Sequence, residues 1–555
     1  MTDVLTDEPA RPADPVGGPA VGPASGHARR RMVAGGLAVL VVAVIVVAVL
    51  ALRGGSGSGP PNGAAAIVPA DALAYVNVSL DGGRAGVGQA LGVARRFPDF
   101  PVAASALLGR LSNVIAGGRA ADYARQIRPW LGGEAALALL DTTTSTAGSL
   151  LILQTRDAAR ARAFVRSEGA VSAGSARGTR LLRYATGNEL AFLGRFLVIG
   201  QDASVRAAIG VSSAGSGSLA TDPTYRRASA GETGDRVLDA YASPAGVRRL
   251  LADQGGAIGA LGSLLYQPSL QAAAMTVTPT SAGLGVRIHS VLDPTLVKVN
   301  GTPNASFTPT LASVMPAGAT LMLDVSGLDR VAPRVLNAGS SAGVAGGIGP
   351  LLTRLGAALR SEGVNVPDII SIFHREAAVA VVPHSGSPTL VIVARTPDPA
   401  RTQRELAALE APLAQLFAPA GNSSASAPVF NDRTVGPVTV HQLALSAGLQ
   451  LDYAVFRGLV VISTGMQGIS AVAQPTGGTL SRAAPYRAVL GGHPSRVTAL
   501  VYADLGKLVS AGAATGLTST LSAITDDLTG VGAVGLTSVR GTTDSTSQLS
   551  IQVPR

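Results

Sequence analysis

Glu134 and Glu376 are the two residues whose type and placement come closest to acid–base chemistry. Each opens an apolar stretch of strand length, EAALALL in one case and EAAVAVV in the other. Two carboxyl groups can hydrolyse a glycosidic bond when they lie roughly 5–10 Å apart across it. A carboxylate at the start of a strand also serves as an ion-pair or edge residue, and the sequence favours that structural role.

The histidines do not have the spacing of metal ligands. None of them forms an HExxH or a His-x-x-x-His pair, which would place two ligands on one face of a helix. His374 and Glu376 are two positions apart and would face the same side of a strand. However, the matching segment of the first half has Gly132 in place of His374, so we predict a structural or solvated histidine and no metal site. The six histidines are His27, His289, His374, His384, His441 and His493.

Motifs for a nucleophile or a cofactor are missing from the sequence. There is no Cys, which removes thiolate nucleophiles, Cys-ligated zinc, disulfides and a lipid-modified Cys anchor. No G-x-S-x-G elbow, SxxK pattern, P-loop or Rossmann fingerprint stands in the context that its chemistry requires. The sequence therefore predicts no cofactor and favours a protein that is not an enzyme.

Two tyrosines and an aspartate complete the candidate residues. Tyr225 and Tyr486 are each followed by Arg and stand in the matching segments LATDPTYRRA and LSRAAPYRAV. They fit ligand contacts, or rings packed in the core with the hydroxyl at its rim, and the second interpretation is favoured. The hydrolase alternative requires Glu134, Glu376, Asp222 or His374 to converge on one cleft.

Six segments recur in the same order at an offset of roughly 240–260 residues, and they must position these side chains. VPADALAYVNVSLD from Val68 resembles VMPAGATLMLDVSGLD from Val314, for example. Strand-length apolar runs alternate with two stretches, 157–169 and 398–417, that are typical of helices capped by an Asp. We predict an α+β fold of two tandem homologous units, each a mainly antiparallel sheet with helices on one face.

An uncharged segment near the N-terminus predicts a membrane anchor. Residues 32–52 are twenty-one residues without a charged or polar side chain, enough for a helix of roughly 30 Å. Arg29, Arg30 and Arg31 precede it, and the positive-inside rule then keeps the N-terminus in the cytoplasm. The alternative is a cleaved signal peptide, with a small-residue stretch at 64–66. Either way, the body is expected outside the cytoplasm.

Composition gives the expected organisation of the chain. The sequence predicts a disordered cytoplasmic tail, a transmembrane helix, a flexible tether, a first α+β unit, a linker and a second unit. In that order, the six segments span residues 1–31, 32–52, 53–66, 67–296, 297–312 and 313–555.

The formal charge of +10 does not indicate nucleic-acid binding. Nearly all of the positive charge is Arg, with Lys only at positions 298 and 507, which is typical of GC-rich residue usage. A nucleic-acid surface usually combines basic clusters with aromatic residues, and aromatics make up only 4% of this chain. We therefore exclude nucleic acid as a partner.

The sequence resembles the bacterial family "domain of unknown function 3352" in four features. These are the apolar segment, the PADALAYVNV opening, the IRPWLGGEAALAL segment and the two-copy layout. The resemblance implies a duplicated, membrane-anchored envelope protein and brings no activity with it. We expect a non-enzymatic binding or structural protein on the outer face of the cell membrane. Its partners would be the lipid bilayer through residues 32–52 and an envelope protein, a cell-wall polymer or an apolar ligand. The alternative is an envelope hydrolase with a carboxylate or Ser site between the units.

Overall fold

The computed structural model describes most of the chain after residue 61. The described residues are 62–98, 100–140, 148–231, 234–252, 269–299, 305–327, 373–384, 388–416, 428–446, 449–508 and 530–554. The predicted anchor, residues 32–52, lies outside them, and none of the described helices is long and apolar enough to cross a membrane.

The described strands join a single antiparallel sheet of 20 strands. Its first ten strands, in spatial order, are β4 (Val171–Ala176), β5 (Thr179–Arg183), β6 (Glu189–Leu193), β7 (Phe196–Gly200), β3 (Gly148–Thr155), β2 (Leu131–Leu140), β1 (Ala74–Ser79), β8 (Leu238–Ala242), β9 (Leu270–Pro279) and β10 (Gly283–Leu292). The sheet continues through β20 (Asp544–Gln552), β19 (Ala533–Arg540), β18 (Ala499–Asp504), β11 (Leu321–Ser326), β12 (Glu376–Val382), β13 (Thr389–Arg395), β17 (Leu459–Ser463), β16 (Leu449–Phe456), β15 (Val438–Ser446) and β14 (Phe430–Val435).

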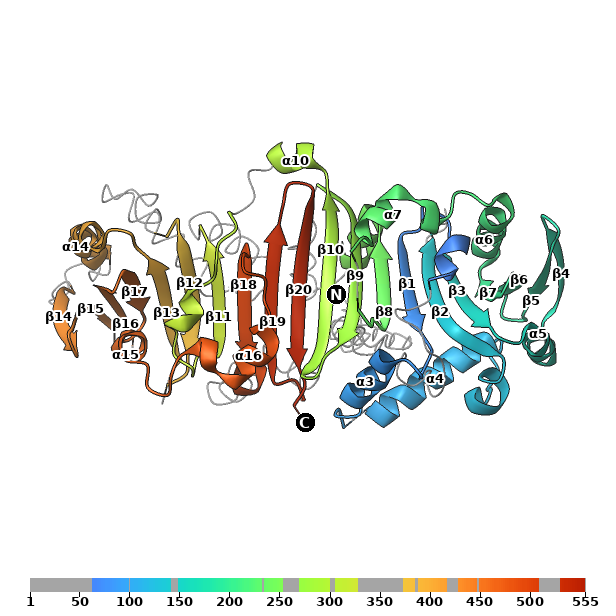
Figure 1. Cartoon of the computed structure of the whole chain (residues 1–555), viewed down its shortest axis with the longest axis horizontal. Helices are drawn as coiled ribbons and strands as arrows, with labels where there is room; N and C mark the ends of the chain where they lie inside the picture. Colours follow the sequence, from blue (N-terminus) through green and yellow to red (C-terminus); the bar gives the residue numbers. More distant parts are fainter. Residues whose placement is uncertain are drawn as a thin grey trace, which may run out of the picture.

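The two halves of the chain meet where β10 pairs with β20. Nine residue pairs, from Gly283↔Gln552 to Val291↔Asp544, form this antiparallel ladder. Figure 1 shows the resulting sheet as one row of strands with β10 and β20 in the middle. At about 4.8 Å between neighbouring strands, 20 strands extend over roughly 90 Å. The halves are thus parts of a single sheet and leave no groove between β10 and β20.

The strand order is the same in both halves, counted outward from this boundary. Registers correspond as well, because Ser79 lies opposite Glu134 and Ser326 lies opposite Glu376. Positions in the paired strands of one half can therefore be assigned corresponding positions in the other. By this register, Asn77 in β1 corresponds to Asp324 in β11.

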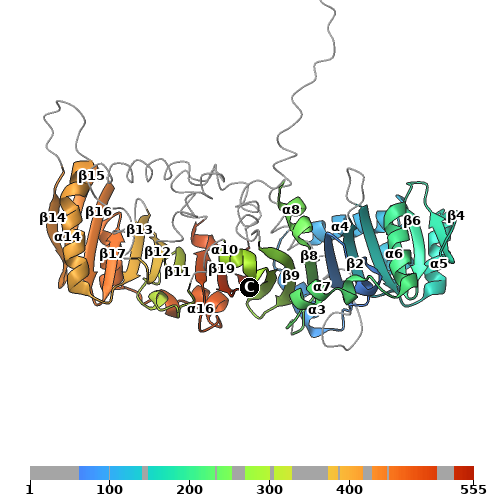
Figure 2. The same ribbon diagram turned by 90° about the horizontal axis from the view of Figure 1, so that it is seen from above.

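The described helices include six in the first half: α3 (Ala85–Ala94), α4 (Phe100–Ile115), α5 (Ala158–Ser167), α6 (Asp202–Ala214), α7 (Pro223–Ala228) and α8 (Pro244–Ala252). In the remainder of the chain they include α10 (Pro294–Val299), α14 (Pro399–Leu416), α15 (Met466–Ala473) and α16 (Ala484–Leu490). Short turns of 3-10 helix are η1 (Ala64–Ile67), η3 (Leu219–Thr221), η4 (Leu311–Ser313) and η5 (Leu480–Arg482), and η2 (Tyr123–Ile127) is a π-helical turn. Figure 2 gives the view at right angles to Figure 1.

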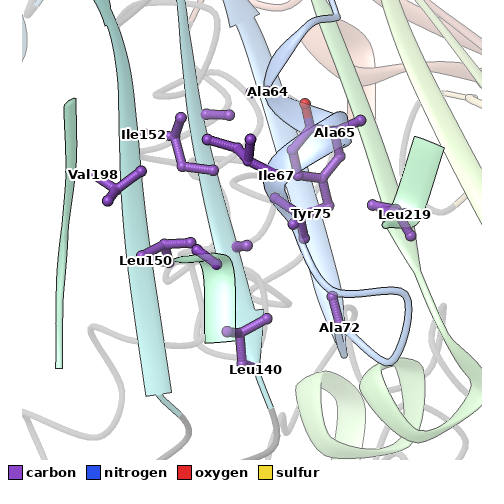
Figure 3. Packing of buried hydrophobic residues seen from close by; sticks show 14 of the residues in the cluster. Ala64, Ala65, Ile67, Ala72, Tyr75, Leu140, Leu150, Ile152, Val198 and Leu219 are labelled. Atoms are coloured by element: carbon purple, nitrogen blue, oxygen red, sulfur yellow. The ribbon is translucent and has the colours of Figure 1, made fainter. Parts of the chain in front are cut away.

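Helices cover both faces of the sheet, so the predicted placement on one face is wrong. On β3, Leu150 and Ile152 pack with η1 and α6, whereas Leu153 packs on the opposite face with Phe164 of α5. Figure 3 shows the first of these faces, with Ile67 of η1 between Ile152 of β3 and Tyr75 of β1. The reason is that β3 is apolar on both faces, and each face must be covered.

Both helices predicted from Asp caps are confirmed. Asp157 accepts a hydrogen bond from the Arg160 amide at 2.9 Å and begins α5. Asp398 accepts from the Arg401 amide at 3.0 Å at the start of α14. Each half also closes with an antiparallel hairpin, β9–β10 in the first and β19–β20 in the second.

One hydrophobic cluster crosses the boundary between the halves. Val87 and Ala90 of α3 pack with Val286 of β10 and Ile551 of β20. The Arg96 guanidinium, just after α3, donates to the Val553 carbonyl at 2.6 Å. The two halves therefore share part of their core as well as their sheet.

The folded body begins earlier than residue 67, the start that composition predicts. Ala64 and Ala65 in η1 are buried, at 0% and 1% exposure. The Leu219 amide donates to the Val68 carbonyl at 2.7 Å and ties this segment to η3. The composition of this segment predicted a tether because alanine and glycine have small side chains that do not mark a buried segment in a sequence. Such small residues can nevertheless pack densely against a sheet.

Candidate functional site

Glu134 holds the segment that enters the first half. Its side chain is fully buried at the start of β2, and its Oε1 accepts the Ala64 N–H at 2.8 Å. The Arg195 guanidinium lies 4.0 Å from Oε2. Burial raises the pKa of Glu134, and the N–H groups at the start of η1 and the charge of Arg195 oppose that rise. A Cβ at Gly63 would lie 2.3 Å from the Arg195 guanidinium, so the two groups approach closely at this point.

Glu376 binds the corresponding backbone segment in the second half. Its Oε1 accepts from the backbone N–H of Leu311 at 2.9 Å and also from the N–H of Thr310, while Oε2 accepts from the Thr310 hydroxyl at 2.5 Å. Arg395 lies 3.8 Å from Oε2 and donates to the Thr310 hydroxyl at 3.0 Å. Each glutamate thus fixes the 3-10 turn that precedes the first strand of its half.

The two glutamates are far apart in the sheet. Glu134 is on β2 and Glu376 is on β12, nine strand positions away. At about 4.8 Å per strand this separation is roughly 43 Å along the sheet. A pair of carboxyl groups that flanks one scissile bond must be several times closer. The described structure therefore gives these two residues no common catalytic cleft.

The other two candidates of the hydrolase alternative, Asp222 and His374, do not bring the two glutamates together. Asp222 caps α7, where its Oδ1 accepts the Tyr225 N–H at 2.7 Å. His374 is exposed in the turn before β12. Asp222 therefore has a structural partner, and the placement of His374 on the surface does not bring it to Glu134.

Tyr225 belongs to a buried tyrosine cluster in the first half. Its hydroxyl accepts from the Asn62 amide at 2.7 Å, and the Tyr75 hydroxyl donates to the Asn62 amide oxygen at 2.8 Å. The Tyr225 ring packs edge-on against Tyr75 and Tyr241, with ring centroids 6.3 and 5.1 Å away. Asn62 is thus held by two hydroxyl groups, and the cluster fixes the first described residue of the chain.

Tyr486 occupies the corresponding place in the second half without the third ring. It is buried in α16 and lies 5.4 Å from Tyr502, measured between ring centroids. Met322 stands where Tyr75 stands in the first half, by the register of β11 with β18. Burial raises the pKa of Tyr486 to about 12, and the nearby Asp324 adds to the rise. Both tyrosines are therefore core residues with polar edges.

Sequence reasoning missed two buried carboxyl groups in the second half. Asp324 is fully buried, and no described hydrogen-bond donor reaches either of its oxygens. Burial and the neighbouring Glu376 raise the pKa of Asp324 to about 9, so it is protonated at neutral pH. Asn77 in the corresponding position was the signal that could have revealed it, because an amide there indicates that the site requires a neutral polar group.

Asp452 on β16 is the second missed residue. It is also fully buried, with neither oxygen hydrogen-bonded to a described donor, and burial raises its pKa to about 6. In the first half Glu189 corresponds to it, and there Arg183 lies 2.5 Å from the carboxylate. Gln442 replaces that arginine opposite Asp452. Among the described residues, Asp452 therefore has no counter-ion like the one that Arg183 supplies to Glu189.

A small hollow of about 120 Å³ lies between α16 and the strands β19 and β20. His493, Thr537, Gln548 and Ser550 supply its polar lining. None of the candidate residues from the sequence lines it, and the described residues contain no cluster of acidic and histidine side chains suited to a metal ion. The hollow gives the candidate residues no shared site.

A structural role for Glu134 makes a direct prediction about its replacement. Glu134→Gln keeps an oxygen acceptor for the Ala64 N–H and should change the free energy of unfolding by less than about 1 kcal/mol. Glu134→Ala leaves that buried N–H without an acceptor and should cost about 2–3 kcal/mol. Trp130, the only tryptophan and buried beside β2, reports the unfolding transition by fluorescence. Equal stability of the two variants would contradict the role.

A comparison with curated protein sequences gives no match. Among solved structures, the chain is similar to three crystal forms of TP0453. Form IV is 12% identical with a TM-score of 0.24, covering 46% of this chain and 89% of that one. Form I is 10% identical with a TM-score of 0.25, and the match covers 45% of this chain and 89% of that one. Form III is 11% identical with a TM-score of 0.24, covering 46% and 91%.

Family comparison covers nearly the whole chain. The matched range includes β1, the segment around Glu134 and both halves of the sheet. Residues 33–553 match the family described as "Protein of unknown function (DUF3352)", and the chain therefore belongs to that family.

Proposed function

We propose that the chain is a single-pass membrane protein whose body lies outside the cytoplasm and has a non-enzymatic binding or structural role. The body would consist of two tandem homologous units that share one sheet. The observation that carries the proposal is the construction of the segment directly after the apolar stretch. Asn62 to Val68 are part of the folded body, held by Glu134, Tyr75, Tyr225 and η3.

This construction supports a retained anchor over a cleaved signal peptide. Cleavage in the small-residue stretch at 64–66 would remove Asn62 and Ala64 and leave Glu134 without the N–H that it accepts. Burying a carboxyl group without that partner costs free energy. The second half keeps the equivalent turn, with Thr310 and Leu311 bound by Glu376. A chain that retains residues 32–52 loses none of these contacts.

The order and register of the strands support the duplication. Six matching sequence segments fall on corresponding strands and helices, including Glu134 with Glu376 and Tyr225 with Tyr486. A non-enzymatic role is supported by the use of both glutamates as structural acceptors about 43 Å apart. A sheet of roughly 90 Å offers an extended surface, which suits a binding or scaffolding protein.

The proposal is tested with a C-terminal alkaline phosphatase fusion, which is active only outside the cytoplasm. We expect activity in intact cells, retention in the membrane fraction after alkaline carbonate washing, and an intact N-terminus by mass spectrometry. Deletion of residues 32–52 should abolish both activity and membrane retention, because the proposal assigns both export and anchoring to this segment. Activity only from a cytoplasmic reporter would overturn the location, and a mature chain that starts after residue 61 would overturn the anchor.

A further inference from the structure

One end of the sheet carries an excess of arginine. Residues 156–200, which form α5 and β4 to β7, contain eight arginines against three acidic residues, a formal charge of +5. All eight arginines are exposed, whereas Glu189 is buried and the other two acids are half-buried. The positive charge therefore lies fully on the surface, whereas none of the three acidic residues is fully exposed.

Two of the three acidic residues of this end, Asp157 and Glu189, are already paired with an arginine. Asp157 caps α5 and pairs with Arg160 at 3.3 Å, and Glu189 pairs with Arg183. Among the described residues, no carboxylate lies within 4.0 Å of Arg162, Arg166 or Arg180. These guanidinium groups keep their charge available to a partner.

The arginines gather on one side of the sheet, around α5. The Arg162 guanidinium lies 4.6 Å above the centre of the Phe192 ring, which holds it in place. A side chain built on Gly169, just beyond α5, would lie 3.2 Å from Arg119. Arg180 shares a face of β5 with Leu182, which packs on the cluster containing Phe164 of α5. We call this surface the arginine face: Arg119, Arg156, Arg160, Arg162, Arg166 and Arg180.

The other half of the chain provides an internal control. Its corresponding elements, residues 396–463, carry four arginines against five acidic residues, a formal charge of −1. The strand order is the same. The fold therefore does not need the positive charge, and general residue usage does not account for it, because both ends come from one gene.

We propose that the arginine face binds a linear, phosphate-bearing polymer of the cell envelope; this partner rests on the proposed location of the body outside the cytoplasm. Guanidinium groups bind phosphate through two parallel N–H donors, and arginine is suited to this geometry. Arg162 and Arg166 are four positions apart on α5, so their guanidinium groups lie one helical turn apart on the same side of the helix. An extended polymer with repeated phosphates can engage them together, whereas a single small ion cannot.

Two other anionic partners fit this surface less well. A nucleic acid would be expected to stack its bases on exposed aromatic rings, and Arg162 covers the ring of Phe192. A membrane surface is usually bound through exposed apolar side chains as well as basic ones. Val171 is the one large aliphatic side chain exposed among residues 156–200.

The test measures binding of the full-length chain in neutral detergent to long-chain inorganic polyphosphate, at several salt concentrations. Wild type should bind with an affinity that falls as salt rises, because bound cations are released from the polymer. The triple variant Arg162→Gln, Arg166→Gln, Arg180→Gln should bind about tenfold more weakly, and the steepness of the salt dependence should fall by about three counter-ions. The matched control is Arg401→Gln, Arg404→Gln, Arg433→Gln, which removes the same charge from exposed positions of the other end.

The control should bind within about twofold of wild type. Equal weakening of both triple variants would overturn the proposal, since net charge alone would then explain binding. Tighter binding to vesicles with 30% phosphatidylglycerol, or to DNA, than to polyphosphate would also overturn it in favour of that partner. These measurements use purified protein, so their failure is distinct from a failure of the reporter test of location.

Discussion

Asp324→Asn is expected to stabilise the second half by about 4 kcal/mol at pH 7. The folded-state pKa of Asp324 is about 9, above the ordinary value of 3.8. The folded protein therefore holds a proton that the unfolded chain releases, and stability falls as pH rises from about 4 to about 9. Asparagine supplies an N–H where the protonated acid supplies an O–H, and it has no proton to lose.

The stabilisation should therefore vanish near pH 4 and grow toward pH 9. Hydrogen exchange of peptides from β11 and β12 in the full-length protein measures it, with peptides from β1 and β2 as an internal reference. The reciprocal change, Asn77→Asp, should destabilise the first half at pH 7, because it places an ionisable group beside the buried Glu134. If Asp324→Asn shifts exchange equally at pH 4 and pH 9, the protonation of Asp324 is contradicted.

Arg183→Gln is expected to destabilise the first half by about 2–3 kcal/mol at pH 7. Glu189 is fully buried, and one of its oxygens accepts two N–H groups from Arg183. Removing the cation leaves a buried carboxylate without its charge partner, which costs far more than losing a surface ion pair. Trp130 fluorescence during urea unfolding measures this change, and Arg180→Gln on the same strand is the control, with an expected loss below about 0.5 kcal/mol.

The opposite change restores the pair in the second half. Gln442→Arg places a cation opposite Asp452, whose pKa is raised by burial to about 6. In wild type, the raised pKa removes stability as pH rises from about 4 to about 6, and the lost stability is not regained above that range. The added arginine should lower this pKa and stabilise the second half above pH 6, with little effect below pH 4. A gain that is independent of pH would mean that Asp452 is not the group involved.

Local pattern was enough to predict the strands, the capped helices and the α+β class. Asp157 and Asp398 stand directly before amphipathic runs, and a cap acts over three residues, so its signal is local. The union of both halves into one sheet was not predictable in this way. It depends on β10 pairing with β20, more than 250 residues later in the chain, and no local pattern encodes that choice of partner.

The candidate residues, too, were only partly predictable from the sequence. The correspondence of Glu134 with Glu376 was visible in the sequence, but the N–H groups that they accept were not. Those donors lie at Ala64 and Leu311, within segments whose composition is typical of tethers and linkers. The buried state of Asp324 also depends on neighbours from distant strands, so a single sequence gives only its alignment with Asn77 as a clue.

The place where the chain enters the body has a mechanical consequence. The turn η1 fixes that entry beside β1, which is six strand positions from β4 but thirteen from β14. At about 4.8 Å per position, the attachment divides the sheet into arms of roughly 29 and 62 Å. If the body is tethered at this off-centre point, rotation about it would move the far end of the longer arm through a wider arc than the end of the shorter arm. The arginine face, on the shorter arm, would then stay closer to the attachment point.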